Sequence, residues 1–271
     1  PGPGVGGHCI PYYPQFLLTQ FATDAIIEGS AEYVQGAYAE QYLGQSTSDR
    51  DLPSDPGYAY FIGRYVEGER YVSARVDSVG EVVDLWETPP NTSEQILHGL
   101  APRSEAPTPF AAVAATKHLA SDATWKFDGA SRIGEFGTMI TLRTRLPGER
   151  ARTAAAGWGN DRVVTFEHAG GNAFVWLTDW DTAADADEFE EATREFAAAP
   201  PADEAPRSNR RAPDLRFARI VWGDQAGAEI DVRRVGDEAV LVAIGPDRFR
   251  DAVAVTERDD IGFDVRIGPP E

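Results

Sequence analysis

Apolar residues recur at helical spacing through the first hundred residues of the chain. This spacing predicts one amphipathic helix from about Thr23 to Leu43 and a second from about Tyr58 to Val79. The positions expected to face a core in the first helix are Phe21, Ala22, Ala25, Ile26, Val34, Ala37 and Tyr38. Those expected in the second helix are Phe61, Ile62, Tyr65, Val66, Val72, Val76 and Val79. A short helical segment is predicted over 81–87, and another behind Thr92 or Ser93, either of which can cap it.

The pattern changes in the second half of the chain, where strands are predicted. Runs over 163–168 and 173–180 form a hairpin around Gly170-Gly171-Asn172, and an acidic helix capped by Asp181 or Thr182 follows as far as about Ala199. Phe189, Ala192 and Phe196 are expected on the inner face of that helix, and Trp158, Trp176 and Trp180 in the core. Further strands are predicted over 215–222, 229–235, 239–244 and 263–267, a helix over 128–146, and a strand or short helix over 110–119.

These elements predict an α+β protein, in which N-terminal amphipathic helices pack with a β-hairpin and helix unit and a small β-rich part follows. The expected organisation is a Gly/Pro-rich segment at 1–19, an α+β domain at 20–199, a linker at 200–213 and a β-rich subdomain at 214–271.

Charge changes this picture by excluding classes of partner. The 271 residues carry 44 acidic and 25 basic side chains, a net charge of −19, and Lys117 and Lys126 are the only lysines. Such a surface repels nucleic acid and anionic membranes, and no apolar run approaches the length of a membrane span. The composition is typical of a protein from a salt-accumulating halophile, because molar salt screens the repulsion.

Candidate chemistry is sparse in this composition. Glu28 lies at the edge of the apolar stripe of the first helix, where a carboxylate needs a cation, donors or a metal, unless it reaches solvent or caps a neighbouring helix. Glu94 and His98 are four residues apart and could face one cleft or form a structural contact. Asn91 begins an Asn-Thr-Ser acceptor pattern for glycosylation. Cys9 is the only cysteine, so the chain has no Cys-based zinc site.

The loop Gly2 to Pro11, Gly-Pro-Gly-Val-Gly-Gly-His-Cys-Ile-Pro, resembles the catalytic-cysteine loop of nucleotide-sugar dehydrogenases, in particular the UDP-N-acetylmannosamine branch. The resemblance implies that Cys9 is a nucleophile in the NAD-dependent oxidation of a UDP-sugar. The rest of the chain departs from that family, because residues 19–271 contain neither a βαβ alternation nor a phosphate loop.

Four ordered motifs between about residues 20 and 200 resemble a different group, the haloarchaeal surface proteins related to gluzincin-type zinc metallopeptidases. They are Ile27-Glu28-Gly29-Ser30-Ala31-Glu32-Tyr33-Val34, Pro89-Pro90-Asn91-Thr92-Ser93-Glu94-Gln95-Ile96-Leu97-His98, Gly157-Trp158-Gly159-Asn160-Asp161-Arg162, and Trp180-Asp181-Thr182 with Ala186-Asp187-Glu188-Phe189. In such peptidases an H-E-x-x-H helix supplies two zinc ligands and the general base, and the E-G-x-A glutamate supplies a third ligand. Only Glu28 corresponds here, since the sequence contains no H-E-x-x-H.

The sequence therefore favours a non-catalytic or degenerate metallopeptidase-like surface module of a halophilic archaeon, whose N-terminal helices are a remnant of the peptidase fold. No cofactor is expected, except zinc if an H-E-x-x-H helix lies upstream, and a peptide or surface glycan is the expected kind of partner. Such a module would be extracellular or on the cell surface through a leader outside this sequence. The alternatives are a cytoplasmic NAD-dependent nucleotide-sugar dehydrogenase fragment that uses Cys9, and a surface binding module in which Glu28 is structural. A chain that starts at Pro1 and joins two resemblances is expected to be a fragment, a natural fusion or an assembly artefact.

Overall fold

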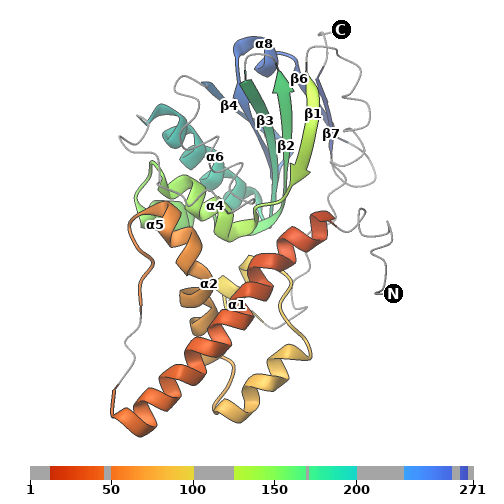
Figure 1. Cartoon of the computed structure of the whole chain (residues 1–271). Helices are drawn as coiled ribbons and strands as arrows, with labels where there is room; N and C mark the ends of the chain where they lie inside the picture. Colours follow the sequence, from red (N-terminus) through yellow and green to blue (C-terminus); the bar gives the residue numbers. More distant parts are fainter. Residues whose placement is uncertain are drawn as a thin grey trace, which may run out of the picture. The chain divides into compact units, whose positions relative to one another are not determined.

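The chain folds into two compact units, as seen in a computed structural model that describes residues 13–45, 50–100, 125–168, 171–199, 229–257 and 263–267. The first unit comprises residues 1–53 and 59–106, and the second comprises 54–58 and 107–271. Helices dominate the N-terminal part of the chain and strands the C-terminal part (Figure 1). The predicted α+β class is therefore confirmed, and the division between the two units falls near residue 106.

The longest element of the first unit is helix α1, Tyr13–Tyr38, which continues into the π-helical turn η2, Ala39–Leu43. Gly44 ends it in the left-handed conformation, with φ 63° and its N–H donated to the carbonyl of Ala39. The predicted end at Leu43 agrees with this, but the predicted start at Thr23 is ten residues too late. Phe16-Leu17-Leu18 is a continuous apolar run without periodicity, so its spacing carried no helical signal.

Helix α2, Pro56–Ser73, packs closely against α1. A Cβ built on Gly29 of α1 would lie 2.1 Å from the carbonyl carbon of Gly68 of α2, so two glycines let the backbones approach. Val66, Tyr71 and Val72 are buried on α2. The predicted core positions Phe61 and Val79 are wrong, because these side chains are 51% and 45% exposed.

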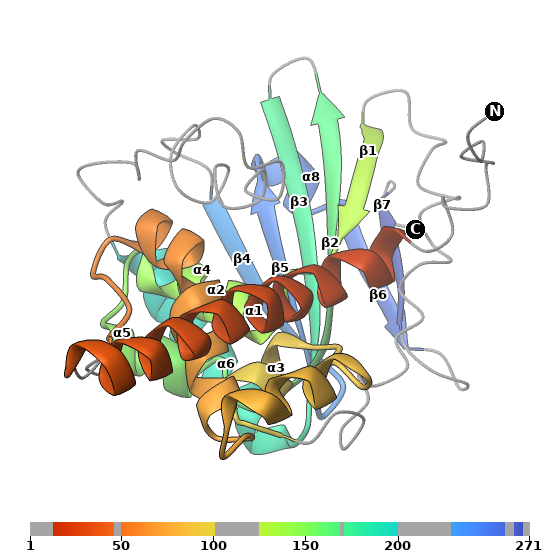
Figure 2. The same cartoon turned by 60° about the horizontal axis from the view of Figure 1, so that its bottom comes forward.

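Two short helices complete the first unit (Figure 2). The 3-10 helix η3, Val79–Trp86, occupies the predicted helical segment, and helix α3, Ser93–Leu97, follows it. Thr92 is the cap of α3, because its hydroxyl oxygen accepts the Gln95 N–H at 3.2 Å, as the sequence predicted.

The second unit contains a five-stranded antiparallel sheet in the order β1-β2-β3-β5-β4. Its strands are β1 Lys126–Ser131, β2 Trp158–His168, β3 Gly171–Trp180, β4 Glu229–Val235 and β5 Ala239–Gly245. The predicted hairpin is confirmed by the pairing of β2 with β3, in which Val163 lies opposite Trp176. The expected helix over 128–146 is wrong in its first part, where β1 lies, and helix α4, Gly134–Arg143, occupies the remainder.

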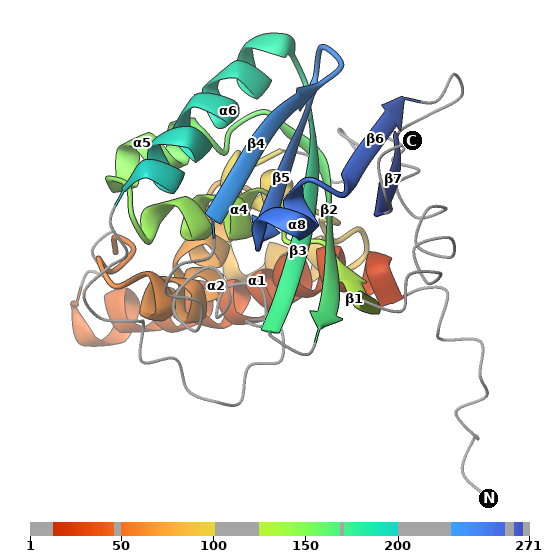
Figure 3. The ribbon, with the colours of Figure 1, turned by 90° about the horizontal axis from the view of Figure 1, so that it is seen from above.

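Helices α4, α5 (Gly148–Thr153) and α6 (Ala183–Ala198) form a layer on one face of this sheet (Figure 3). The predicted inner residues of α6 are buried, and Phe189 contacts both Trp176 and Trp180, with ring centroids 5.2 and 4.6 Å apart. Trp158, Trp176 and Trp180 are core residues as predicted. Thr182 caps α6 through the N–H of Asp185.

The opposite face of the sheet is covered by a second apolar cluster that includes Phe166, Leu177 and Leu241. Helix α8, Asp247–Arg250, contributes Phe249 to this cluster, and Val253 begins strand β6, Val253–Glu257. β6 pairs with β7, Phe263–Ile267, in a separate two-stranded sheet. The predicted linker at 200–213 and the expected elements at 110–119 and 215–222 lie outside the described residues.

Candidate functional site

Glu28 lies on the side of α1 that faces α2. The neighbouring phenol of Tyr65 has a raised pKa, first because it is partly removed from solvent and then because the Glu28 carboxylate is close and hydrogen-bonded to it. One turn away on either side, Asp24 pairs with Arg64 at 3.2 Å and Glu32 pairs with Arg50. Glu28 is thus the middle member of a row of carboxylates that meets hydrogen-bond donors within the first unit.

These surroundings do not fit a catalytic zinc centre. Such a centre needs three protein ligands, usually with two imidazoles. Glu28 instead lies beside the phenol of Tyr65 and one turn from the Asp24–Arg64 pair. Among the residues that the structure describes, no group of three or more His, Cys, Asp or Glu side chains could hold a metal ion. No metal step is therefore assigned to Glu28.

The fold does not assemble the other candidate site residues that the structure describes into a metal site with Glu28. Glu94 is buried in α3, whereas His98 at the end of the same helix is exposed. Asn91 is exposed, and its backbone N–H donates to the Gln95 side chain at 2.7 Å. Cys9 lies outside the described residues, so the dehydrogenase alternative and its NAD requirement stay predictions.

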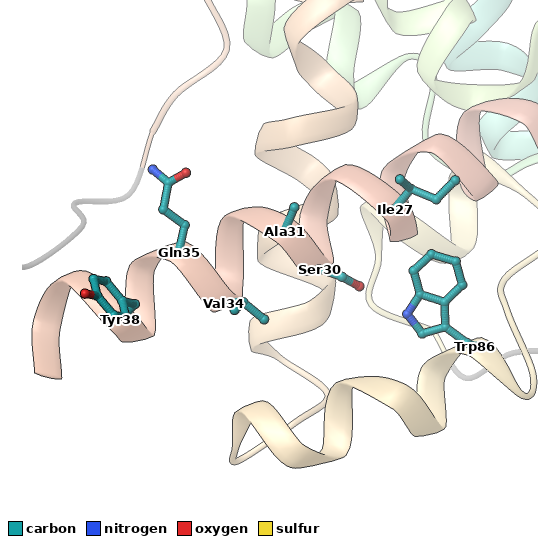
Figure 4. A pocket seen from close by; sticks show the side chains of 7 residues that line it. All are labelled: Ile27, Ser30, Ala31, Val34, Gln35, Tyr38 and Trp86. Atoms are coloured by element: carbon teal, nitrogen blue, oxygen red, sulfur yellow. The ribbon is translucent and has the colours of Figure 1, made fainter. Parts of the chain in front are cut away.

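A groove with an apolar lining runs along α1 and is closed on one side by η3 (Figure 4). It has a volume of about 630 Å³. Its lining residues are Ile27, Ser30, Ala31, Val34, Gln35, Tyr38 and Trp86. Trp86 extends from η3 toward Ile27 and is 49% exposed, and Ile27, Val34 and Tyr38 are between 40% and 58% exposed. This surface is a large apolar feature of the first unit that the described residues leave open to solvent.

The sequence prediction of which α1 residues are buried is only partly right. Ala22, Ala25 and Ile26 are buried as predicted, but Val34 and Tyr38 are exposed and line the groove. Sequence reasoning missed the groove because it assigned all apolar positions of α1 to one stripe. The spacing of Ile27, Ala31, Val34 and Tyr38 was the available signal, since these residues follow a second helical stripe beside the first.

The second unit contains a buried polar cluster at the Gly157–Arg162 motif. The Asp161 carboxylate is fully buried and accepts the N–H groups of Ile133 and Gly134, at the start of α4, and Nε1–H of Trp176 at 3.3 Å. Burial raises the pKa of Asp161, against the opposing effect of these hydrogen bonds. Asp161 therefore works as a helix cap inside the core.

Two arginines lie near this cap. Arg162 is 4% exposed, and within the described part of the chain its Nε and Nη1 have no hydrogen-bond partner, nor does Nε of Arg132. Burial and the neighbouring charge of Arg132 lower the pKa of Arg162. The Gly157–Arg162 motif thus places charged side chains in the core, where Asp161 caps α4. Gly157 allows close packing, because a Cβ at this position would lie 2.5 Å from the Asp185 carboxyl carbon.

The fold and these sites define a two-unit α+β protein with an open apolar groove in the first unit and a helix-covered antiparallel sheet in the second. The chain belongs to the family described as Domain of unknown function (DUF8575), which matches residues 124–260. Neither the curated proteins nor the solved structures include a match to the chain. No helix among the described residues is long and apolar enough to cross a membrane.

Proposed function

We propose that this chain is a metallopeptidase-like surface module that binds a partner and does not hydrolyse it. The four ordered motifs support the relationship to haloarchaeal surface proteins of the gluzincin type. The observation that carries the non-catalytic assignment is the position of Glu28, whose carboxylate is engaged by Tyr65 in the contact between α1 and α2. A carboxylate used in this way stabilises helix packing, and the described residues bring no group of His, Cys, Asp or Glu side chains to it that could complete a zinc site.

The groove along α1 supports the binding role. A row of half-exposed apolar side chains next to an exposed tryptophan is costly to leave in water and is typical of an interaction site. A binding function needs only this surface, whereas peptide hydrolysis needs an activated water and a general base that the residues around Glu28 do not supply.

Glu28→Gln tests this proposal in the purified full chain. We expect less than about one zinc in ten chains before and after the substitution, measured by metal analysis after dialysis against zinc, and no metal-dependent cleavage of a casein substrate. We also expect the pKa of Tyr65 to fall toward its ordinary value, because a neutral amide in place of the carboxylate removes the nearby negative charge. Tyrosine-selective NMR titration reads this shift.

Glu40→Gln is the matched control, since Glu40 is an exposed carboxylate in η2. It should leave the Tyr65 titration unchanged. One tightly bound zinc per chain that is lost in Glu28→Gln, together with proteolysis that chelators abolish, would refute the proposal.

A further inference from the structure

The groove along α1 carries features that identify its occupant. Ile27, Ala31, Val34 and Tyr38 repeat at i, i+4, i+7 and i+11 and form one wall, about three helical turns or ~16 Å long. Trp86 of η3 forms the other wall (Figure 4). A straight apolar trough of this length fits an amphipathic helix with its own apolar residues at three- and four-residue spacing.

The η3 side of the groove is acidic, whereas three carboxylates of α1, Asp24, Glu28 and Glu32, are engaged by Arg64, Tyr65 and Arg50. Residues 13–43 and 77–87 contain no lysine or arginine. Their acidic residues are Asp24, Glu28, Glu32 and Glu40 in the first stretch, and Asp77, Glu81, Asp84 and Glu87 in the second. Asp84 and Glu87 are exposed on either side of Trp86 in the sequence. Charge complementarity therefore calls for a partner whose polar face is basic.

The aromatic residues of the groove reinforce this preference. Trp86 and Tyr38 are both about half exposed, and Tyr38 is paired with Tyr42 at 4.8 Å between ring centroids. Exposed indole and phenol rings bordered by carboxylates attract lysine and arginine side chains through cation–π contacts as well as through charge.

One polar atom inside the groove lacks a partner. Ser30 is 7% exposed, and its Oγ is buried and makes no hydrogen bond to another residue that the structure describes. Ser30 lies on the wall of α1 between Ile27 and Val34, and its hydroxyl points to the side where η3 lies (Figure 4).

We propose that this groove binds a basic amphipathic helix of a partner protein, with the apolar face of that helix against Ile27, Val34 and Trp86. The inference rests on the proposed binding function and names its partner class. A second copy of this chain is a poor occupant, because its net charge is −19 and an isologous contact would place the acidic η3 segments against one another.

Fluorescence titration of the full chain with a synthetic leucine/lysine amphipathic peptide of about five helical turns tests this assignment. The tryptophans of the described residues other than Trp86 are at most 4% exposed, and Trp222 lies outside those residues, so the protection from acrylamide quenching that is lost in Trp86→Phe is the signal of Trp86. We expect saturable binding, and at least about tenfold weaker binding of the same peptide with glutamate in place of lysine. Trp86→Phe should remove most of the signal.

Substitutions in the groove separate docking from general charge attraction. Ile27→Gln and Val34→Gln should each weaken binding of the lysine peptide about tenfold without a change of net charge. Val83→Gln is the matched control, because Val83 is 65% exposed on η3 and does not line the groove. Circular dichroism of each variant checks that the helices persist.

Equal binding of the lysine peptide by wild type, Ile27→Gln, Val34→Gln and Val83→Gln would overturn the proposal, as would an absence of saturable binding. Mass spectrometry of the peptide after titration tests the proposed function separately. Intact peptide supports a binding module, whereas metal-dependent cleavage of bound peptide would refute the non-catalytic role and leave the groove assignment standing.

Discussion

Asp161 shows how one side chain joins two elements of the second unit. Its carboxylate accepts the N–H of Gly134 at 2.9 Å and of Ile133 at 3.1 Å, two of the amides that the start of α4 leaves without helical partners. It also accepts the indole N–H of Trp176 on the neighbouring strand β3. A residue on β2 thereby fixes where α4 begins and how it lies on the sheet.

We predict that Asp161→Ala lowers the free energy of unfolding of the second unit by about 3 kcal/mol or more, because it leaves buried donors unsatisfied. Asp161→Asn should cost less, since one acceptor oxygen stays and the charge that burial disfavours is removed. Glu167→Gln, an exposed substitution on the same strand, should stay within about 0.5 kcal/mol. Urea denaturation measures all three, and equal stability of Asp161→Ala and Glu167→Gln would contradict the capping role.

At the scale of elements, the contact between α1 and α2 depends on small residues. The Cβ of an alanine at position 29 would lie 2.1 Å from the Gly68 backbone, and one at position 68 would lie 2.1 Å from the Ala25 carbonyl oxygen. Neither helix backbone can yield by that distance without opening the interface that also holds the Asp24–Arg64 pair.

Gly29→Ala is therefore expected to destabilise the first unit by about 2–3 kcal/mol, although alanine has the higher helix propensity. Gly80→Ala is the control in the same unit, because a Cβ there meets only the Ser78 hydroxyl at 3.9 Å. Thermal unfolding followed by far-ultraviolet circular dichroism compares the two variants. A melting temperature of Gly29→Ala equal to that of the wild type would show that the helices do not meet as described.

At the scale of the whole molecule, the excess of acidic groups sets the conditions for stability. A net charge of −19 on 271 residues produces self-repulsion that water at low ionic strength does not screen. Arginine pairs relieve part of it, for example Arg150 with Glu195 at 3.0 Å and Arg234 with Asp187 at 2.9 Å. The remaining carboxylates depend on dissolved cations.

We predict that the melting temperature rises between about 0.1 M and about 2 M potassium chloride, because the Debye length falls from about 10 Å to below about 3 Å. Differential scanning calorimetry reads this shift. Sucrose at equal osmolality is the control for exclusion of solute from the surface, and it should raise the melting temperature less. A melting temperature independent of the potassium chloride concentration would contradict the prediction and show that repulsion between carboxylates does not limit stability.

The local elements were accessible from the sequence because their signals lie within a few residues of one another. Apolar spacing predicted α1 and α2, and the Gly-Gly-Asn turn predicted the β2–β3 hairpin. Of the two cap candidates that the sequence offered for α3 and for α6, the structure selects Thr92 and Thr182. The burial of Trp158, Trp176 and Trp180 followed from their size and apolar character.

Tertiary structure alone decided the relations between distant segments. One such relation is the position of β5 between β3 and β4 in the sheet, and another is the contact of Asp161 with the start of α4. Each brings together segments that are far apart in the sequence. Periodicity placed the apolar positions of α1 in a single stripe. Only the positions of α2 and η3 determined that Ala25 and Ile26 are buried while Ile27 and Val34 line an open groove. The sequence by itself thus determined which segments form helices and strands, because those preferences are local. Their packing determined which apolar face stays in water, because burial depends on what lies opposite.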